Sequence, residues 1–323
     1  MATALLADGL IKEFQIGFWR RRPTRALDGL TLEVPMGGVF GLLGPNGAGK
    51  STTLKILLHL LRPTAGRAEV LGRPPGDVGA RRRLGFLPEH PTFYDHLTAV
   101  ELLTYFAGLF GYAGAERARR VQEALDRVGL AEARSRAMRG YSKGMVQRVG
   151  LAQALINDPE LVILDEPMSG LDPLGRREVR EIILGLREAG RTVVFSSHVL
   201  SDAEMLCSRA AIVSHGRVVA SGTLTDLTRG EGRGAEVVVT GLDRAAADRL
   251  AVRMTRVTEI APGRFSITAP ASVAPETLVA ELVAAGASLV SVTPLRVTLE
   301  DVFVARVAGA AEGGGQAAEE RPS

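Results

Sequence analysis

The chain has 323 residues, of which 46% are hydrophobic and 23% are charged, and it contains one cysteine, Cys207. This composition excludes a mostly disordered chain, a collagen-like repeat and a disulfide-stapled mini-protein, and the length predicts roughly two domains. A formal net charge of +3 gives little overall attraction toward nucleic acid or an anionic membrane. No segment approaches the roughly 20 continuous apolar residues that span a bilayer. The N-terminus also lacks a signal-peptide pattern, so we expect a cytoplasmic chain.

The first part of the chain predicts strands that lead into a glycine-rich turn. Residues 1–35 alternate short apolar stretches with polar breaks, which suits antiparallel strands. Gly38–Leu43 is expected to be a short apolar strand that runs straight into the turn. Ser51–Leu61 follows with helical spacing, since its leucines fall on one face.

The middle of the chain predicts an α/β core that carries a helical insert. Residues 78–156 have leucines and alanines at a spacing of three to four, and we place the insert at about residues 85–156. Leu161–Asp165 and Thr192–Ser196 are apolar across both faces, as buried parallel strands are. Pro173–Ala189 fits a helix between them. This alternation of strand, helix and strand is typical of an α/β fold.

A change in the character of the sequence predicts a second, smaller domain. Thr228–Gly234 is glycine-rich and is the expected linker between an N-terminal domain of residues 1–228 and a C-terminal α+β domain of residues 235–305. Its expected strands are Glu236–Thr240 and Arg264–Thr268, and its expected helices are Ala245–Met254 and Pro275–Ala285. Residues 306–323 offer almost nothing to bury, so we expect a disordered tail.

The segment from Gly44 to Ser51 fits the phosphate-loop pattern of glycine, four residues, glycine, lysine and a hydroxyl residue. Glycines let backbone N–H groups point inward at phosphate oxygens, and the positive end of the following helix adds to the same site. We expect Lys50 to reach the β- and γ-phosphates as a compact charge and the Ser51 hydroxyl to be a Mg²⁺ ligand. The alternative is a glycine turn that binds nothing. The expected nucleotide contacts are Gly44, Asn46, Gly47, Ala48, Gly49, Lys50, Ser51 and Thr52.

Two adjacent acids, Asp165 and Glu166, end one apolar strand. Ligands sit at the carboxyl ends of strands in such sheets, and a carboxylate buried there is unfavourable unless a cation pairs with it. Because adjacent strand residues point to opposite faces, we expect different roles for the two acids. Asp165 is predicted to join Ser51 in the magnesium shell, and Glu166 to polarise the attacking water. The alternative is a pair of solvated acids.

His198 follows the next predicted strand. If that strand neighbours Leu161–Asp165, the imidazole emerges at the same rim as the carboxylates, where it could contact the γ-phosphate. Spacing alone leaves open whether His198 is simply a surface or core residue.

The chain resembles the nucleotide-binding subunit of ATP-binding cassette (ABC) transporters over residues 5–225. The resemblance is carried by the order of the phosphate loop, the strand that ends in carboxylates and the later histidine. The segment Tyr141–Arg148 resembles the family's signature and begins a helix that leads to Asp165. The resemblance implies a P-loop NTPase core of the ABC ATPase type, with an antiparallel β subdomain and a helical insert, that hydrolyses ATP with Mg²⁺. It also implies a head-to-tail homodimer, in which Ser142 and Gly144 of one subunit close over ATP held by the other.

The same resemblance assigns two further contacts to the nucleotide and the dimer. Phe14 stands where an aromatic ring stacks on adenine, with Phe18 and Trp19 as nearby competitors. Ser169–Asp172 resembles the loop that communicates across the dimer, and Asp172 is its key acid.

The resemblance also covers His198 and two departures from the commonest motifs of the family. His198 resembles the switch histidine, which implies a catalytic contact with the γ-phosphate. Gly85–Glu89 resembles the loop between magnesium and the transmembrane partner, although Glu89 replaces the usual glutamine and is expected to bind the metal. Lys143 and Met145 replace a glycine and the glutamine of the commonest signature. These changes, and the chain beyond residue 228, resemble subunits of type-2 exporters.

The resemblance therefore implies an ATPase subunit that drives an exporter from the cytoplasmic face of the cell membrane, through a separate polytopic permease and without a nucleic-acid partner. The helical insert around Glu89–Gly111 is expected to dock on the permease. The alternative is a soluble ABC ATPase acting on DNA or ribosomes, but such relatives carry two cassettes, cysteine-ligated zinc or long coiled coils. A kinase or GTPase would leave the signature unexplained, and the sequence lacks the Asn-Lys-x-Asp motif of guanine binding.

Overall fold

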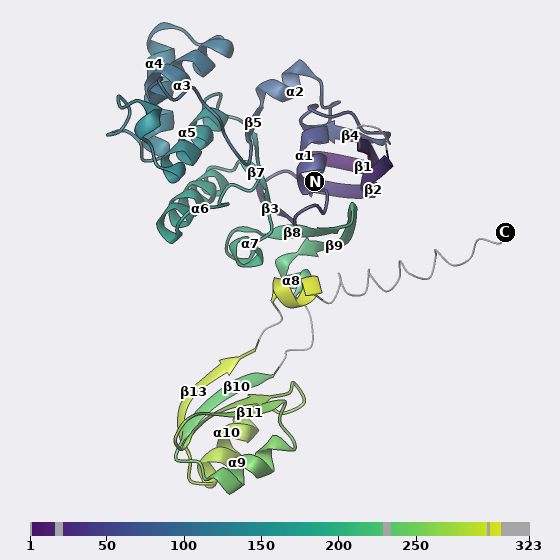
Figure 1. Ribbon diagram of the computed structural model, residues 1–323, viewed down its shortest axis with the longest axis vertical. Coiled ribbons are helices and arrows are strands. Elements are labelled where there is room, and N and C mark those ends of the chain that lie inside the picture. The colour runs from purple at the N-terminus through teal and green to yellow at the C-terminus, as the bar shows by residue number, and fades with distance from the viewer. Residues whose placement is uncertain (1, 17–21, 229–233, 296–297, 305–323) are drawn as a thin grey trace, which may run out of the picture. The chain divides into compact units, whose positions relative to one another are not determined.

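The computed structural model describes residues 2–16, 22–228, 234–295 and 298–304, which fall into two compact units (Figure 1). The first unit ends at Leu224 and the second begins at Thr225. The aromatic residues Phe18 and Trp19, much of the expected linker and the expected tail of residues 306–323 lie outside the described residues. Within the described part of the chain, no helix combines the length and the apolar composition that crossing a bilayer needs.

An antiparallel sheet opens the first unit. Its described strands, in spatial order, are β2 (Arg22–Pro35), β1 (Thr3–Ile16) and β4 (Ala65–Val70). Buried and exposed residues alternate along β2 from Leu30 to Val34, since one face of the sheet packs on the core. The antiparallel strands expected in residues 1–35 are confirmed, whereas β4 is not predicted from the sequence.

A larger sheet forms the centre of the first unit. Its described strands, in spatial order, are β5 (Leu84–Leu87), β6 (Leu161–Leu164), β7 (Thr192–Ser197), β3 (Gly38–Leu43), β8 (Arg209–Ser214) and β9 (Arg217–Thr223). All neighbours are parallel except β8 and β9. Every residue of β6 and β7 is buried, which confirms the two predicted parallel strands.

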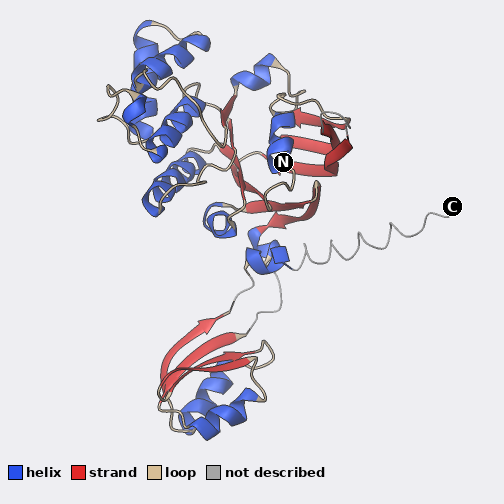
Figure 2. Ribbon diagram, viewed as in Figure 1, coloured by secondary structure: helices blue, strands red, loops and turns tan. Residues whose placement is uncertain are grey.

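Helices flank this sheet and build a lobe beside it. The described helices of this unit are α1 (Lys50–Leu57), α2 (Val78–Arg82), α3 (Ala99–Leu109), α4 (Gly114–Arg127), α5 (Lys143–Leu155), α6 (Pro173–Glu188) and α7 (Leu200–Leu206), with a short 3₁₀ turn at Met138–Gly140. The short helix α8 (Leu224–Leu227) begins at the last residue of this unit and continues into the second. The helices α3, α4 and α5 pack together as the lobe, which lies between β5 and β6 in the chain (Figures 1 and 2). The expectation of mostly helix over residues 78–156 is wrong at β5, a four-residue edge strand too short to show a period.

The predicted helix Ser51–Leu61 is shorter than expected and ends at Leu57. His59 adopts a left-handed backbone conformation with φ 57°, which a helix cannot continue through. The N–H of Leu60 then donates to the carbonyl of Lys55 and closes the last turn. The chain after Leu57 is therefore free to lead toward β4 rather than extend the helix.

One hydrophobic cluster joins both sheets of the first unit through α1. It includes Leu5, Leu10 and Leu30 of the antiparallel sheet, Leu54 and Leu57 of α1, and Leu42, Ile163 and Val194 of the larger sheet. Burying one such side chain stabilises the fold by about 1.5–3 kcal/mol. Because β3 and α1 both belong to this cluster, the loop that joins them is anchored at its two ends.

The second unit is an α+β fold with its own core. Its described elements are β10 (Ala235–Thr240), α9 (Arg244–Ala251), β11 (Arg256–Ala261), β12 (Arg264–Ala269), α10 (Pro275–Ala284) and β13 (Ser288–Pro294). The strands form an antiparallel sheet in the order β11-β12-β10-β13, a split βαβ arrangement. The expected strands and helices of this region are present, while β11 and β13 are not predicted, because β13 is exposed along its whole length and lacks alternation.

Candidate nucleotide site

Three neighbouring strands place the predicted site residues at one edge of the larger sheet. The strands β6, β7 and β3 are adjacent and parallel, so their carboxyl ends meet at the same edge. Gly44 follows β3, Asp165 and Glu166 follow β6, and His198 follows β7. Because β7 neighbours β6, His198 emerges at the same edge of the sheet as Asp165 and Glu166.

The phosphate loop surrounds a hollow of about 380 Å³, called here the phosphate hollow. Its lining residues are Ala26, Pro45, Asn46, Gly47, Ala48, Gly49, Lys50, Ser51, Thr52, Glu89 and Glu166. Gly49 has φ 108° and precedes α1; a Cβ atom there would lie 2.7 Å from Leu27 Cδ2 and 2.9 Å from the Ala26 carbonyl oxygen. Glycine is thus required at this position, and the first turn of α1 has no side-chain cap, so its N–H groups are available to an anion.

Lys50 is buried at the base of the phosphate hollow, with 5% of its surface exposed. Its Nζ donates to the Gly44 carbonyl at 2.7 Å and to the Pro45 carbonyl at 3.2 Å. The same atom lies 3.2 Å from Glu166 Oε1. The ammonium is therefore held between the loop backbone and one carboxylate.

The two adjacent acids have separate partners. Asp165 Oδ1 accepts hydrogen bonds from Ser51 Oγ at 3.0 Å and from Ser196 Oγ at 2.7 Å. Glu166 Oε2 lies 2.8 Å from Nδ1 of His198. The expected reason for this separation, alternation along a strand, is wrong, since β6 ends at Leu164. A left-handed backbone at Glu166, with φ 48°, turns its side chain away from that of Asp165 instead.

One oxygen of Glu166 retains acceptor capacity. Its Oε1 is buried and pairs with the charge of Lys50, yet it accepts no hydrogen bond of good geometry from the described residues. Buried polar atoms usually have a hydrogen-bond partner, and a water molecule beside the phosphates could donate to this oxygen.

The donor set suits magnesium better than a metal that needs many side chains. Among the described residues, no group of three or more histidine, cysteine, aspartate or glutamate side chains is arranged to hold a metal ion. Mg²⁺ is usually bound by one or two carboxylates together with substrate phosphates and water. The hydroxyl of Ser51 beside Asp165, with Glu89 on the same hollow, fits that pattern.

Phe14 lies on β1, half-buried, and does not line the phosphate hollow. The ammonium of Lys12 lies 5.2 Å from the centre of its ring. Ala26 of β2 reaches the hollow instead. Phe18 and Trp19 lie outside the described residues, so the choice among the three aromatics stays a prediction.

The signature segment begins α5 and lines a different hollow, called here the signature hollow, of about 420 Å³. Ser142 is the N-cap residue of α5, and its hydroxyl accepts the N–H of Met145 at 3.3 Å. Gly144 and Asp172 line the same hollow. Asp172 also caps α6, because its Oδ1 accepts the N–H of Gly175 at 2.8 Å.

Lys143, which stands where the commonest signature has a glycine, packs against the neighbouring loop. A Cβ atom on Gly170 would lie 2.1 Å from Lys143 Nζ, so the lysine packs directly over that glycine. Gly170 has φ 65° and belongs to the loop Ser169–Asp172. The signature helix α5 is thus in contact with this loop through Lys143.

Three residues of the region are not predicted from the sequence as site residues. Gln147 is buried, and its Nε2 donates to the Pro167 carbonyl at 3.0 Å, which ties α5 to the residue after Glu166. Ser196 contacts Asp165, as described above. Burial raises the pKa of Tyr141, whose hydroxyl donates to the Ala133 carbonyl at 2.7 Å. The sequence does not mark these residues as site residues: Tyr141 and Gln147 lie within the signature segment but are not its predicted nucleotide contacts, and Ser196 lies two residues before His198.

The parallel sheet, the glycine-rich loop and the paired acids define a phosphate-loop nucleoside triphosphatase. The family model described as ABC transporter matches residues 27–169. The uncharacterised ABC transporter ATP-binding protein sll0415 of Synechocystis sp. is 46% identical over 295 residues, which cover 91% of this chain and 81% of that protein. The daunorubicin resistance ATP-binding protein DrrA3 of Streptomyces coeruleorubidus is 38% identical, over 94% of this chain and 95% of that protein.

A solved structure resembles the first part of the chain. It is a dimeric post-hydrolysis state of the ATP-binding cassette MJ0796 bound to ADP and Pi. The match has a TM-score of 0.61 and 27% identity, and it covers 68% of this chain and 98% of that chain. The chain belongs to the ABC transporter family as an ATP-binding protein, and it is an ATPase.

Proposed function

We propose that this chain is the ATP-hydrolysing subunit of an exporter, working as a head-to-tail homodimer on a separate polytopic permease at the cytoplasmic face of the cell membrane. The observation that carries the proposal is the meeting of Lys50, Asp165, Glu166 and His198 at one sheet edge. A relative named for daunorubicin resistance supports export as the task.

The geometry supports a distinct role for each residue of the phosphate hollow. Lys50 binds the β- and γ-phosphates, which compete with Glu166 for the ammonium. Ser51, Asp165 and Glu89 hold Mg²⁺, which when bound offsets the negative charge on the phosphates. Loop backbone N–H groups complete the cradle for the phosphates.

The base and the histidine act on the attacking water. Glu166 Oε1 has the acceptor capacity to take a proton from that water. His198 holds Glu166 through the other oxygen at 2.8 Å, and it contacts the γ-phosphate in the proposed complex. Phe14 is proposed to stack on the adenine.

The separation of the signature hollow from the phosphate hollow supports a second copy of the chain in the ATP complex. The phosphate hollow and the signature hollow share no lining residue. The N-terminus of α5 attracts anions, with Ser142 and Gly144 at its start. In a head-to-tail dimer this terminus meets the γ-phosphate held by Lys50 of the other copy, and Asp172 lies at the same face.

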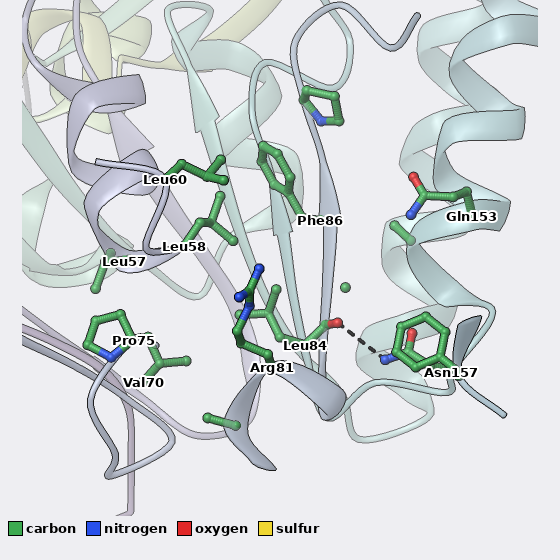
Figure 3. A pocket seen from close by; sticks show the side chains of 15 residues that line it. Leu57, Leu58, Leu60, Val70, Pro75, Arg81, Leu84, Phe86, Gln153 and Asn157 are labelled. Carbon is green, nitrogen blue, oxygen red and sulfur yellow. Dashed lines mark hydrogen bonds between the residues drawn. The ribbon is translucent and has the colours of Figure 1, made fainter. Parts of the chain in front are cut away.

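An apolar groove of about 360 Å³ supports a docking site for the permease (Figure 3). This docking groove is lined chiefly by Leu58, Leu60, Val70, Leu84, Phe86 and Phe110. In Figure 3, Leu58 and Leu60 face Phe86 across the groove, and Asn157 of the opposite wall donates to the Leu84 carbonyl at 3.2 Å. Phe110 belongs to the segment expected to dock, and an amphipathic cytoplasmic helix of the permease is the occupant whose chemistry fits.

The substitution Leu60→Asp tests the docking groove. The Leu60 side chain is 56% exposed, so the fold should tolerate the change. A carboxylate buried against an apolar helix is unfavourable, and we expect the permease recovered with the chain from membranes to fall by about tenfold or more. Recovery is measured by pulldown and quantitative mass spectrometry, with the thermal midpoint as a check on folding.

The exposed apolar residue Val252 of the second unit provides the matched control, Val252→Asp. Equal recovery of permease with both variants would contradict the docking groove. Recovery of nucleic acid or ribosomes by the unaltered chain, in place of a polytopic membrane protein, would favour the soluble ABC ATPase.

A further inference from the structure

Ser196 is a fully buried hydroxyl on β7 at the level of the two acids. It lies on the strand next to β6, two residues before His198. Its hydroxyl has two partners, and both belong to the turn that carries the acids. The side chain therefore does more than fill space in the core.

The two hydrogen bonds of Ser196 connect the acids to each other. Its Oγ donates to Asp165 Oδ1 at 2.7 Å and accepts the backbone N–H of Glu166 at 2.8 Å. Ser51 Oγ donates to the same Asp165 oxygen at 3.0 Å. The Ser196 hydroxyl thus holds the side chain of Asp165 and the backbone of Glu166.

The bond to Glu166 matters because the backbone there is unusual. Glu166 has φ 48°, a region that residues with a side chain seldom adopt. In this conformation its carboxylate reaches both Lys50 and His198. Without an acceptor for the Glu166 N–H, the backbone is free to relax toward an ordinary conformation and carry the carboxylate away from those partners.

We propose that Ser196 is a positioning residue that sets Asp165 for the metal and Glu166 for the attacking water at the same time. This inference rests on the proposed roles of those two acids. Ser196 does not line the phosphate hollow, so it acts through Asp165 and Glu166. A misplacement of about 1 Å in a catalytic group lowers a rate by about 10²-fold, which sets the scale of the effect.

The substitution Ser196→Ala removes both bonds, and Ser196→Thr retains a hydroxyl that can make them. For Ser196→Ala we expect kcat to fall by about 10–100-fold while KM for ATP changes by less than about threefold, since the bonds serve the transition state. For Ser196→Thr we expect at least half of the wild-type kcat. The matched control is Ser214→Ala, a buried strand serine of the same sheet whose hydroxyl bonds only His215 among the described residues.

A second measurement does not depend on turnover. The affinity of the full-length, ADP-bound chain for Mn²⁺, measured by electron paramagnetic resonance, should weaken by about tenfold in Ser196→Ala, because partners of a metal ligand tune metal affinity. ATP affinity in EDTA should stay within about twofold of wild type in Ser196→Ala and Ser214→Ala, since the phosphate loop is unaltered.

Wild-type kcat and Mn²⁺ affinity in Ser196→Ala would overturn the inference. So would a Ser196→Thr variant that binds ATP in EDTA normally but is as slow as Ser196→Ala, or a Ser214→Ala variant with the same loss of kcat. Glu166→Gln is measured in parallel to separate the two claims. Undiminished turnover in Glu166→Gln defeats the proposed function of the site, whereas lost turnover there with normal turnover in Ser196→Ala defeats only the role of Ser196.

Discussion

Replacement of Glu166 by glutamine is expected to lower the steady-state rate of ATP hydrolysis by about 10²–10⁴-fold while ATP still binds. Glutamine keeps the shape of the side chain but cannot accept the proton of the attacking water. Its neutral amide also removes the anion that lies 3.2 Å from Lys50 Nζ, which leaves the ammonium free for phosphate. The variant should therefore accumulate as an ATP-bound dimer.

Two measurements check the Glu166→Gln prediction: the steady-state rate of phosphate release, and size-exclusion chromatography with and without ATP. The control is Glu160→Gln. Glu160 immediately precedes the start of β6, and its half-exposed carboxylate pairs with Arg83. The turnover of this variant should stay within about twofold of wild type, because surface ion pairs contribute little. Normal turnover in Glu166→Gln would remove Glu166 as the base, and a monomer in ATP would count against the closed dimer.

Much of the larger sheet could be predicted because its strands are apolar on both faces. Leu161–Leu164 and Thr192–Ser197 are buried throughout, and such runs stand out against helices with a polar side. The edge strand β5 of this sheet and the edge strand β13 of the sheet in the second unit lack this signal. One is only four residues long, and the other is exposed along its length, so only their pairing with neighbours identifies them as strands.

The candidate site shows the same division between local and non-local information. Lys50, Ser51 and Asp165 could be placed together because a glycine loop and a strand end each have a local pattern. The turn at Glu166 could not, because its left-handed backbone depends on Ser196, which is distant in sequence and approaches only when β7 pairs with β6. Contacts of this kind depend on strand order, which a single sequence does not state.

Replacement of Lys50 by alanine is expected to abolish measurable ATP hydrolysis and to weaken ATP binding by at least about 10–100-fold, the range that loss of one charge-assisted hydrogen bond implies. A second effect follows from burial. Glu166 is 7% exposed, and removing its cation leaves a buried carboxylate whose remaining side-chain partner is the imidazole of His198. Breaking a buried pair in this way destabilises a protein by about 3–5 kcal/mol, so the thermal midpoint should fall as well.

The two effects of Lys50→Ala can be separated by a second substitution. In Lys50→Ala/Glu166→Gln the unpaired charge is gone, so stability should recover toward that of wild type while ATP binding stays weak. Lys55→Ala is the control, because Lys55 lies on the exposed side of the same helix, α1. Isothermal titration with ATP and thermal unfolding are measured for all three variants. Unchanged ATP affinity in Lys50→Ala, or equal losses in Lys55→Ala, would show that the loop does not bind phosphate through this lysine. Recovery of ATP binding together with stability in the double variant would show instead that Lys50 serves mainly to neutralise Glu166.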